Sequence, residues 1–458
     1  MYQLTMSSGR QADFERLREQ YPFFEYRHFE AKTEKKGLRL TFTFNLSDKY
    51  SFQPSLFFQA HPLLAVPDQK TLDNLAFNIG MIELISYWKA ACSPLIIVRP
   101  FRLPAPQLEF WKSLYWNGLG EFFHTNGIRC DESSFLKIEA TEGNVVDPFV
   151  NHAHDKRVLV PVGGGKDSAV SLELLASSGH EVIPFMLNPS PAMLRIIQAS
   201  GTETSLPMAV NRSLDPQLID LNAKGFLNGH TPFSALLAFV TSAAAVLTQT
   251  KHIALSNESS ANEATIPGTH INHQYSKSLH FESSFRAYLA EYLTPTINYF
   301  SLLRPLNELQ IAWLFSRMPQ YHSAFRSCNA GSKTDSWCGQ CPKCLFTYTI
   351  LSPFLGQSDL VRIFGKDLLS DTTMLPLLES LAGLTTHKPF ECVGTVSEVQ
   401  ACLNYLNQRN QGQLHDLPHL LETRLNPQQQ VDTMLRGFDP HHHLTSHFEN
   451  LLRSSLND

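Results

Sequence analysis

The segment 158–168 carries the clearest chemical signal in the chain, because three glycines in it are followed by Lys166, Asp167 and Ser168. Strand-forming residues precede the glycines, and residues 168–178 have a helical pattern. A glycine turn between a strand and a helix lets backbone N–H groups approach an anion at the positive end of the helix dipole. Ser168, at or near the helix N-cap, adds a hydroxyl donor. The segment therefore predicts a phosphate site rather than an ordinary tight turn.

Two familiar phosphate motifs do not fit this segment. A Walker A loop places Ser or Thr after Gly-Lys, whereas Asp167 follows Lys166 here, and no G-x-G-x-x-G can be laid over residues 163–168. The segment instead resembles the Ser-Gly-Gly-x-Asp-Ser signature of the PP-loop ATP pyrophosphatases, with Gly163 in place of the first Ser. That resemblance implies an enzyme that splits ATP into AMP and pyrophosphate and leaves its substrate adenylated. The residues it assigns to pyrophosphate and its Mg²⁺ are Gly163, Gly164, Gly165, Asp167 and Ser168, while Lys166 either joins them or faces solvent.

Four of the eight cysteines form a cluster with the spacing Cys-x9-Cys-x2-Cys-x2-Cys, namely Cys328, Cys338, Cys341 and Cys344. The two short steps place three thiolates on one tight turn, and four thiolates suit a tetrahedral structural Zn²⁺. An iron–sulfur cluster uses the same ligands. Some PP-loop enzymes instead carry sulfur on a cysteine pair, but a complete set of four ligands favours a closed structural site. We therefore expect zinc, with an iron–sulfur cluster or four unrelated buried thiols as the alternatives.

Residues 256–286, called the polar segment below, are unusually polar and follow an expected strand at 253–256. The polar segment should leave the sheet at its carboxyl edge, where ligands bind in parallel sheets. Such a stretch is either solvated filler or the wall of a binding site, and its expected position beside the nucleotide favours the wall. Lys277 could neutralise phosphate or carboxylate charge, and Glu258 or Glu282 could hold Mg²⁺ or act as a base.

The chain from about residue 151 alternates between expected strands and helices. This alternation predicts right-handed βαβ units and a parallel sheet, with the glycine turn after the first strand. The fold class we expect is therefore α/β, with helices on both faces of a PP-loop type sheet over residues 151–355. The strands are expected at 158–162, 182–187, 206–210 and 253–256, and the helices at 168–178, 191–200 and 231–250.

Two further units are expected to flank this domain. Residues 1–150 should form an α+β domain, because alternating strand patterns precede two helical patterns. Residues 356–458 are mainly helical in pattern and end in a polar tail rich in Gln, Asn and His. The strand patterns lie at 23–31, 38–45 and 51–59, and the helical patterns at 70–91, 107–125, 358–370, 373–383 and 396–409.

Composition limits the classes of partner. The chain has 458 residues, of which 43% are hydrophobic and 17% charged, as in a soluble globular protein of two or three domains. A net charge of -5 argues against a dominant nucleic-acid surface. Residues 231–250 carry no charge, but their Thr, Ser and Gln side chains favour a buried helix over a membrane span. Because no apolar signal core is found at the N-terminus, we expect a cytoplasmic protein.

Several segments together resemble one family more closely, the UDP-N-acetylmuramoyl-L-alanyl-L-glutamate epimerases of bacterial cell-wall synthesis. The segments Asn272-His-Gln-Tyr-Ser-Lys-Ser278 and Lys388-Pro-Phe-Glu-Cys-Val-Gly-Thr395 narrow the resemblance beyond PP-loop enzymes in general. The other segments are the glycine turn, the cysteine cluster, Leu227-Asn-Gly-His-Thr-Pro232, Leu255-Ser-Asn-Glu258 and Phe325-Arg-Ser-Cys-Asn329. The resemblance runs from the middle of the chain into its last quarter and is looser over the first 150 residues.

This resemblance implies ATP-dependent inversion of the terminal L-Glu of UDP-MurNAc-L-Ala-L-Glu. Adenylation of the glutamate carboxylate removes the negative charge beside the α-carbon, so that the proton there can be removed and the enolate stabilised by donors. We expect His273, Lys277 and Glu282 to handle substrate charge and proton transfer, with Cys392 a further base unless it is a buried structural thiol. Residues expected to line the nucleotide pocket are Asn188, Asn257 and Glu258.

Three other functions compete with this one. An enzyme making 7-cyano-7-deazaguanine also pairs the glycine turn with a four-cysteine zinc site, but its chains are much shorter. A tRNA-thiolating PP-loop enzyme would carry a basic RNA-binding module, which the composition does not indicate. A nucleotide sensor without catalysis would not need the polar segment.

Overall fold

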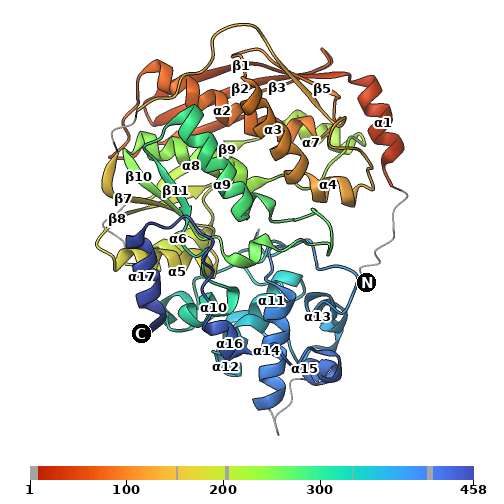
Figure 1. The fold of residues 1–458 in the computed structure, drawn as a ribbon, viewed down its shortest axis with the longest axis vertical. Helices are drawn as coiled ribbons and strands as arrows, with labels where there is room; N and C mark the ends of the chain where they lie inside the picture. Colours follow the sequence, from red (N-terminus) through yellow and green to blue (C-terminus); the bar gives the residue numbers. More distant parts are fainter. Residues whose placement is uncertain (1–8, 151–152, 202–205, 333, 410–415, 458) are drawn as a thin grey trace.

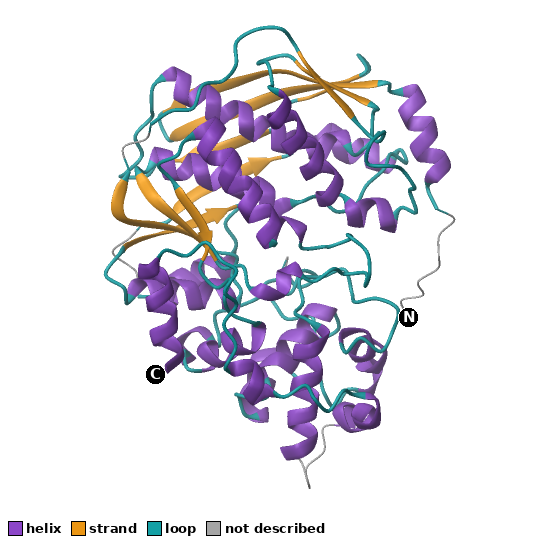
Figure 2. Cartoon of the chain, in the orientation of Figure 1, coloured by secondary structure: helices purple, strands orange, loops and turns teal. Residues whose placement is uncertain are grey.

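A mixed sheet of eleven strands organises the protein, whose computed structural model describes residues 9–150, 153–201, 206–332, 334–409 and 416–457. The strand order is β11-β10-β7-β8-β9-β4-β2-β1-β5-β6, and β3 pairs with β2 beside this path. Figure 1 shows the sheet and its covering helices in one half of the molecule and a second, helical half below them, and in Figure 2 the orange strands lie above the lower half, which is drawn as purple helices and teal loops. The expected α/β class is therefore confirmed, but the parallel strands expected to form a sheet of their own belong to one larger mixed sheet.

Five parallel strands form the part of the sheet that carries the glycine turn. β7 (His154–Pro161) lies between β8 (Glu181–Leu187) and β10 (Thr250–Leu255), and β9 (Met208–Ser213) and β11 (Asn298–Ser301) lie outside them. The chain passes from β7 to one side and later returns to the other, so the strand order reverses at β7. Ligands of open α/β sheets bind at the carboxyl ends of strands at such a reversal. The glycine turn follows β7 and lies at this position.

Four helices connect and cover the parallel strands: α5 (Lys166–Ala176), α6 (Pro191–Ala199), α7 (Pro216–Ala223) and α8 (Phe233–Leu247). α8 is buried along most of its length, because alanines and large apolar side chains fill both of its packed faces. The sequence interpretation of residues 231–250 as a buried helix is thus confirmed. None of the helices in the described ranges combines the length and apolar character that crossing a bilayer requires.

The strands of the first 150 residues extend this same sheet. β1 (Phe23–Glu34), β2 (Gly37–Leu46), β3 (Tyr50–Phe52) and β4 (Ser55–Gln59) are antiparallel, and β5 (Leu95–Val98) and β6 (Lys137–Ala140) add parallel strands beyond β1. β4 pairs antiparallel with β9, from Ser55 opposite Ser213 to Phe58 opposite Val210. The boundary expected near residue 150 does not interrupt the sheet, and one hydrophobic core contains side chains from both sides of it.

Helices from the first half of the chain cover the extended sheet. α2 (Gln69–Trp88) is buried along nearly its whole length and packs against β1 and α8. α1 (Gln11–Gln20), α3 (Ala105–Gly118) and α4 (Gly120–Thr125) complete this layer. α2 begins at an N-cap, Asp68, whose carboxylate accepts hydrogen bonds from the backbone N–H groups of Lys70 and Thr71.

A second hydrophobic core joins the parallel strands to the helical half. The helices of this half are α10 (Glu308–Ser316), α11 (Pro342–Leu351), α12 (Gln357–Phe364), α13 (Leu375–Leu381), α14 (Val396–Arg409), α15 (Asp416–Leu421), α16 (Val431–Leu435) and α17 (Ser446–Asn457). The sequence interpretation of the last residues as a polar tail missed α17. Phe448 of α17 is buried with its ring 4.6 Å from that of Phe300 in β11, so the tail returns to the sheet.

Candidate active site

The glycine turn has the backbone of an anion cradle. Gly164 has φ of 84°, and a Cβ there would lie 2.9 Å from the Cβ of Ala192, so glycine is required. A Cβ on Gly163 would meet no atom within 4 Å, which leaves open space at that residue. Gly165 is the N-cap of α5, and Ser168 in the first turn donates its hydroxyl to the Gly165 carbonyl at 3.0 Å. The amide groups at the start of α5 therefore face the turn, as a phosphate would require.

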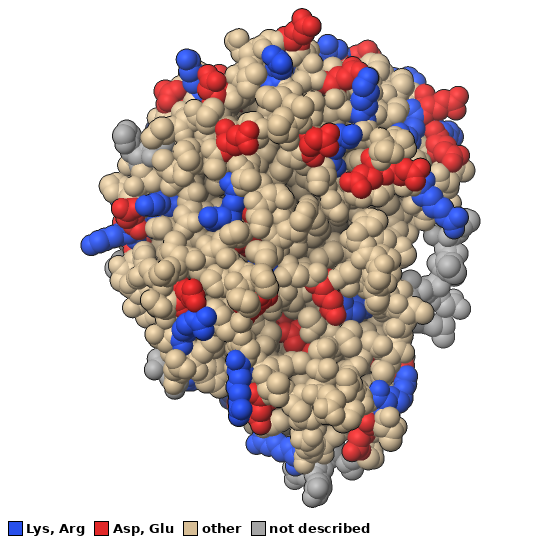
Figure 3. Space-filling view, in the orientation of Figure 1, with Lys and Arg blue, Asp and Glu red and all other residues tan. Residues whose placement is uncertain are grey.

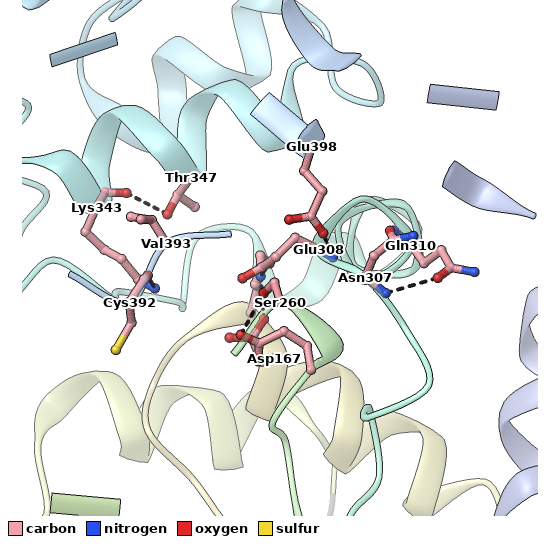
Figure 4. Close-up of polar contacts among 12 residues, drawn as sticks. Asp167, Ser260, Asn307, Glu308, Gln310, Lys343, Thr347, Cys392, Val393 and Glu398 are labelled. Atoms are coloured by element: carbon pink, nitrogen blue, oxygen red, sulfur yellow. Dashed lines mark hydrogen bonds and ion pairs between the residues drawn. The ribbon is translucent and has the colours of Figure 1, made fainter. Parts of the chain in front are cut away.

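Lys166 and Asp167 begin α5 and enter a buried ionic cluster. Lys166 is 5% exposed and contacts the carboxylates of Asp167 and Glu308, so it does not face solvent. Burial, together with the charges of Asp167 and Glu258, raises the pKa of Glu308. Burial would raise the pKa of Asp167 as well, but the charge of Lys166 lowers it. Figure 4 shows Asp167 and Glu308 facing one another, with Glu398 beside Glu308.

The three residues expected to line the nucleotide pocket follow the ends of two parallel strands. Asn188 comes directly after β8, and its side-chain oxygen accepts a hydrogen bond from the backbone N–H of Arg212 at 2.7 Å. Asn257 and Glu258 follow β10, and Asn257 donates to the Ser301 hydroxyl at 3.0 Å. Glu258 is buried. All three residues share the edge of the sheet on which the glycine turn lies.

Cys392 lies in a group of cationic side chains. The Nζ atom of Lys277 is 3.3 Å from its sulfur, His273 is hydrogen-bonded to its thiol, and Lys343 donates to its carbonyl. Burial alone would raise the pKa of the thiol, but the charge of Lys277, the hydrogen bond with His273 and the charge of Lys343 lower it to about 6. Cys392 is therefore a thiolate at neutral pH, whereas burial raises the pKa of the thiol of Cys402.

Glu121 of α4 extends this group from the other half of the sheet. Its Oε2 atom contacts Nδ1 of His273 and lies 3.2 Å from Nδ1 of His230. Burial would lower the pKa of His273, but its hydrogen bonds with Cys392 and Glu121 raise it to about 9. Burial lowers the pKa of His230 to about 4. At neutral pH, a protonated His273 thus connects the Cys392 thiolate to the Glu121 carboxylate.

Glu282 lies apart from the group around Cys392, in a buried ion pair. Its carboxylate accepts a hydrogen bond from Arg304 Nη2 at 3.0 Å and another from the backbone N–H of Ser301 at 3.1 Å, and it is 1% exposed. Arg304 also donates to the backbone carbonyls of Glu258 and Lys277. Glu258 and Lys277 both belong to the polar segment, so Arg304 connects two parts of its backbone. Most residues of the segment are buried or partly buried.

The four cysteines form a compact cluster at the start of α11. Sulfur atoms lie 3.7 Å apart for Cys328 and Cys341, 3.7 Å for Cys338 and Cys344, and 3.5 Å for Cys341 and Cys344. Tetrahedral bonding to one Zn²⁺ at about 2.3 Å separates sulfurs by about 3.8 Å. An iron–sulfur cluster spreads its thiolates over two or more irons. These separations therefore fit a single tetrahedral ion. Lys343, which reaches Cys392, lies in the first turn of α11 between two of these cysteines.

Several residues of this site were not identified from the sequence. These residues are Glu121 in α4, His230 before α8, Glu308 in α10, Lys343 in α11 and Arg304 in the turn after β11. His230 and Lys343 lie within segments that carried the family resemblance, and their place in those segments could have marked them as site residues. Glu121, Glu308 and Arg304 lie in ordinary helical or strand-end patterns, so no local signal marked them.

Comparisons with known proteins agree along most of the chain. A family model described as the MurL N-terminal domain matches residues 15–302, and one described as the MurL C-terminal domain matches residues 322–434. Three curated relatives are each named UDP-N-acetyl-alpha-D-muramoyl-L-alanyl-L-glutamate epimerase. The relative from a Micromonospora species is 39% identical over 74% of this chain and 76% of its own length. The relative from Salinispora tropica is 39% identical over 76% and 77%, and that from Xanthomonas oryzae pv. oryzae 36% over 72% and 74%.

Proposed function

The chain belongs to the MurL family of epimerases, and from this premise we propose that it inverts the terminal L-Glu of UDP-MurNAc-L-Ala-L-Glu to D-Glu in peptidoglycan precursor synthesis. It is an enzyme of the isomerase class. We further propose that ATP activates the glutamate carboxylate as an acyl-adenylate, with release of pyrophosphate and later of AMP.

One observation carries this proposal: the positive charges of Lys277 and Lys343 act both on Cys392 and on Asp167, which follows the glycines. Lys277 and Lys343 lower the pKa of Cys392 and also that of Asp167 in the glycine turn. A substrate carboxylate lying between these lysines would be close both to a nucleotide held at the turn and to a thiolate base. Activation and proton removal require that proximity, because the carboxylate and the α-carbon are adjacent atoms of one glutamate.

Adenylation is the first step of the proposed reaction. Backbone N–H groups of residues 163–165 and the start of α5 bind the phosphates, and Lys277 guides the glutamate carboxylate to the α-phosphorus. Pyrophosphate leaves as the carboxylate oxygen bonds to that phosphorus. Asp167 and Glu258 are the carboxylates that would hold Mg²⁺, which neutralises phosphate charge when bound. Adenylation also removes the negative charge of the glutamate carboxylate, and this loss makes the α-proton more acidic.

Proton transfer follows on the acyl-adenylate. The Cys392 thiolate removes the α-proton, and the electron pair of the C–H bond moves into an enolate that the Lys277 ammonium stabilises. Because His273 contacts Cys392, its imidazolium supplies a proton to the opposite face of the α-carbon through an intervening water, and it is recharged from the Cys392 thiol through their hydrogen bond. Water then cleaves the acyl–phosphate bond and releases AMP. Glu282 has a positioning role through Arg304, because its carboxylate is already engaged.

The four-cysteine cluster has a structural role in this proposal. A Zn²⁺ bound there would fix the turn that precedes α11 and thereby hold Lys343 against the carbonyl of Cys392. We assign it no step in the chemistry.

The deciding experiment measures isotope exchange and pyrophosphate in one reaction. The protein is incubated with ATP, Mg²⁺ and UDP-MurNAc-L-Ala-L-Glu in D₂O. Deuterium should enter the glutamate α-position, D-Glu should accumulate, and pyrophosphate should be released. Cys392→Ser should release pyrophosphate but exchange no deuterium, which separates activation from proton transfer. Exchange that proceeds without ATP would refute the adenylate, and an absence of both exchange and pyrophosphate would refute the whole proposal.

A further inference from the structure

A cavity of about 170 Å³ lies between α2, α7 and the start of α8, away from the glycine turn. Its lining includes Lys89 and Arg212, the amide side chains of Asn222 and Asn228, and apolar side chains at its rim. The established family activity concerns a glutamate, and neither the glycine turn nor the group around Cys392 contributes a residue to this lining. The cavity is therefore a separate feature that needs its own explanation.

The rim of the cavity is apolar and exposed. Phe233, Ile219 and Leu214 line it and are 47%, 63% and 43% exposed. Seven large apolar side chains in the described residues are at least 43% exposed, and Phe233 is the one aromatic side chain among them. An exposed aromatic ring beside two aliphatic side chains offers a flat surface on which a planar ring can stack.

The floor of the cavity is cationic. Lys89 is 7% exposed, donates to the Thr231 hydroxyl at 2.7 Å and to the Gly229 carbonyl, and has no carboxylate partner among the described residues. Arg212 pairs with Glu83 through Nε and one terminal nitrogen at 2.8 and 2.9 Å, and its Nη1 atom has no partner in the described chain. Glu83 pairs with Arg212, and the charge of Glu121 acts on Lys89 without forming an ion pair with it in the described residues. An anion entering the cavity would therefore meet a buried ammonium with no carboxylate in contact and the free Nη1 donor of Arg212.

The cavity also contains an acceptor without a donor. The side-chain oxygen of Asn222 is buried and has no hydrogen-bond partner in the described residues. An unsatisfied buried oxygen is costly, and a ligand N–H would satisfy it. The imide N–H of a uracil ring is such a donor, and it lies at the edge of a ring whose face can stack on Phe233.

A short segment connects this cavity to the proposed active site. Residues 228–233 line the cavity through Asn228, Thr231 and Phe233. His230, in the middle of the segment, lies 3.2 Å from Glu121, and its ring centre is 4.8 Å from that of His273. A ligand in the cavity is therefore on the other side of one loop from the group around Cys392.

We infer that this cavity binds the uridine diphosphate end of the substrate, with the uracil ring against Phe233 and Asn222 and the phosphates against Lys89 and Arg212. The inference rests on the proposed function for the identity of the nucleotide. It divides the two nucleotides between two sites, ATP at the glycine turn and uridine diphosphate in the cavity.

The test measures UDP binding to the full-length protein by titration calorimetry, without ATP or dipeptide. UDP should bind at one site, and saturating ATP should not displace it. Phe233→Ala should weaken UDP binding about tenfold, because base stacking on an aromatic side chain is lost. Asn222→Leu keeps a side chain of similar size and should weaken UDP binding about fivefold through the lost acceptor. Leu420→Ala, which removes an equally exposed apolar side chain far along the chain, is the matched control and should bind UDP as the wild type does.

Three results of the UDP titration would overturn the inference. Equal UDP affinity in the wild type, Phe233→Ala and Asn222→Leu overturns the inference, as does displacement of UDP by ATP or a failure of UDP to bind. Inorganic pyrophosphate serves as a second probe: if both variants lose pyrophosphate as strongly as UDP, the base contacts are wrong. Because no turnover is needed, normal UDP binding with no deuterium exchange would refute the proposed function and leave the cavity assignment standing.

Discussion

Replacing Lys277 with methionine should convert the Cys392 thiolate into a thiol at neutral pH. Methionine keeps the apolar stem of the side chain and removes its charge, which lies 3.3 Å from the sulfur. The pKa of Cys392 is about 6, so about 90% of the side chain is ionised at pH 7. Lys277 is the largest of the groups that lower this pKa against the effect of burial.

The size of the change follows from Coulomb's law. Two unit charges 3.3 Å apart attract by about 1.3 kcal/mol in a water-like medium and by about 5 kcal/mol at an effective dielectric constant of about 20. One pKa unit corresponds to about 1.4 kcal/mol, so removal of the ammonium raises the pKa of Cys392 by about one to four units. The midpoint of ionisation should therefore move from about 6 to between about 7 and 10.

The assay is the pH dependence of alkylation by iodoacetamide, with the modified peptide containing Cys392 quantified by mass spectrometry. The thiolate is the reacting form, so the rate follows the ionised fraction. Peptide-level detection separates Cys392 from Cys130, the other partly buried cysteine outside the four-cysteine cluster, whose pKa burial raises to about 11. Lys277→Arg keeps a positive charge and is the matched control, with an expected midpoint near that of the wild type.

Two results would refute this reasoning. A wild-type alkylation midpoint near 9, the ordinary value for a cysteine, would show that the cations around Cys392 do not control its ionisation. Equal midpoints for the wild type and Lys277→Met would show that Lys277 does not. In the first case the thiolate could not serve as the resting base of the proposed mechanism, and in the second case another group would have to ionise it.

Four other outcomes test the remaining parts of the site. Epimerase kcat/KM should rise as pH increases through about 6, where Cys392 loses its proton, and fall as pH increases through about 9, where His273 loses its proton. In Glu121→Gln the fall in kcat/KM should occur about one pH unit lower, whereas the rise near pH 6 should not move. Asp167→Asn should abolish pyrophosphate release with an unchanged circular dichroism spectrum, and retained release would remove Asp167 from phosphate binding. Glu282→Gln leaves the Arg304 charge buried and should lower the free energy of unfolding in urea by about 3–5 kcal/mol, whereas a stable but inactive variant would point to chemistry at Glu282. Stripping the four-cysteine site with a chelator should lower the melting temperature and release one Zn²⁺ per chain, and an unchanged melting temperature would exclude a structural ion.

Charge on the molecular surface agrees with a small-molecule substrate. On the face drawn in Figure 3, Lys and Arg side chains are interspersed with Asp and Glu side chains rather than gathered in one area. The net charge of -5 led to the same expectation from composition. The cationic groups that matter for the proposed chemistry, Lys166, Lys277 and Lys343, lie inside the site and not on an open surface.

Much of the parallel half of the fold could be predicted from the sequence, since its signals are local. A run of buried strand residues, a glycine turn and an apolar helix follow one another within about 20 residues, and each forms where its own periodicity indicates. The strands β5, β6 and β11 were not predicted, because each has only four residues and too short a run to show a period. The tail helix α17 was missed because its buried residues Phe448 and Leu452 are few among polar ones.

The sequence by itself determined the glycine turn, the four-cysteine cluster and the family, since each depends on residue types at fixed short spacing. Only the tertiary structure decided which charges face one another. Glu121 meets His273 across 152 residues and Lys166 meets Glu308 across 142. β4 joins β9, and this pairing makes two expected domains share one sheet. Such contacts depend on strand register and on packing between distant elements, and the ionisation of Cys392 depends on them because electrostatic energies vary with distance and burial rather than with sequence separation.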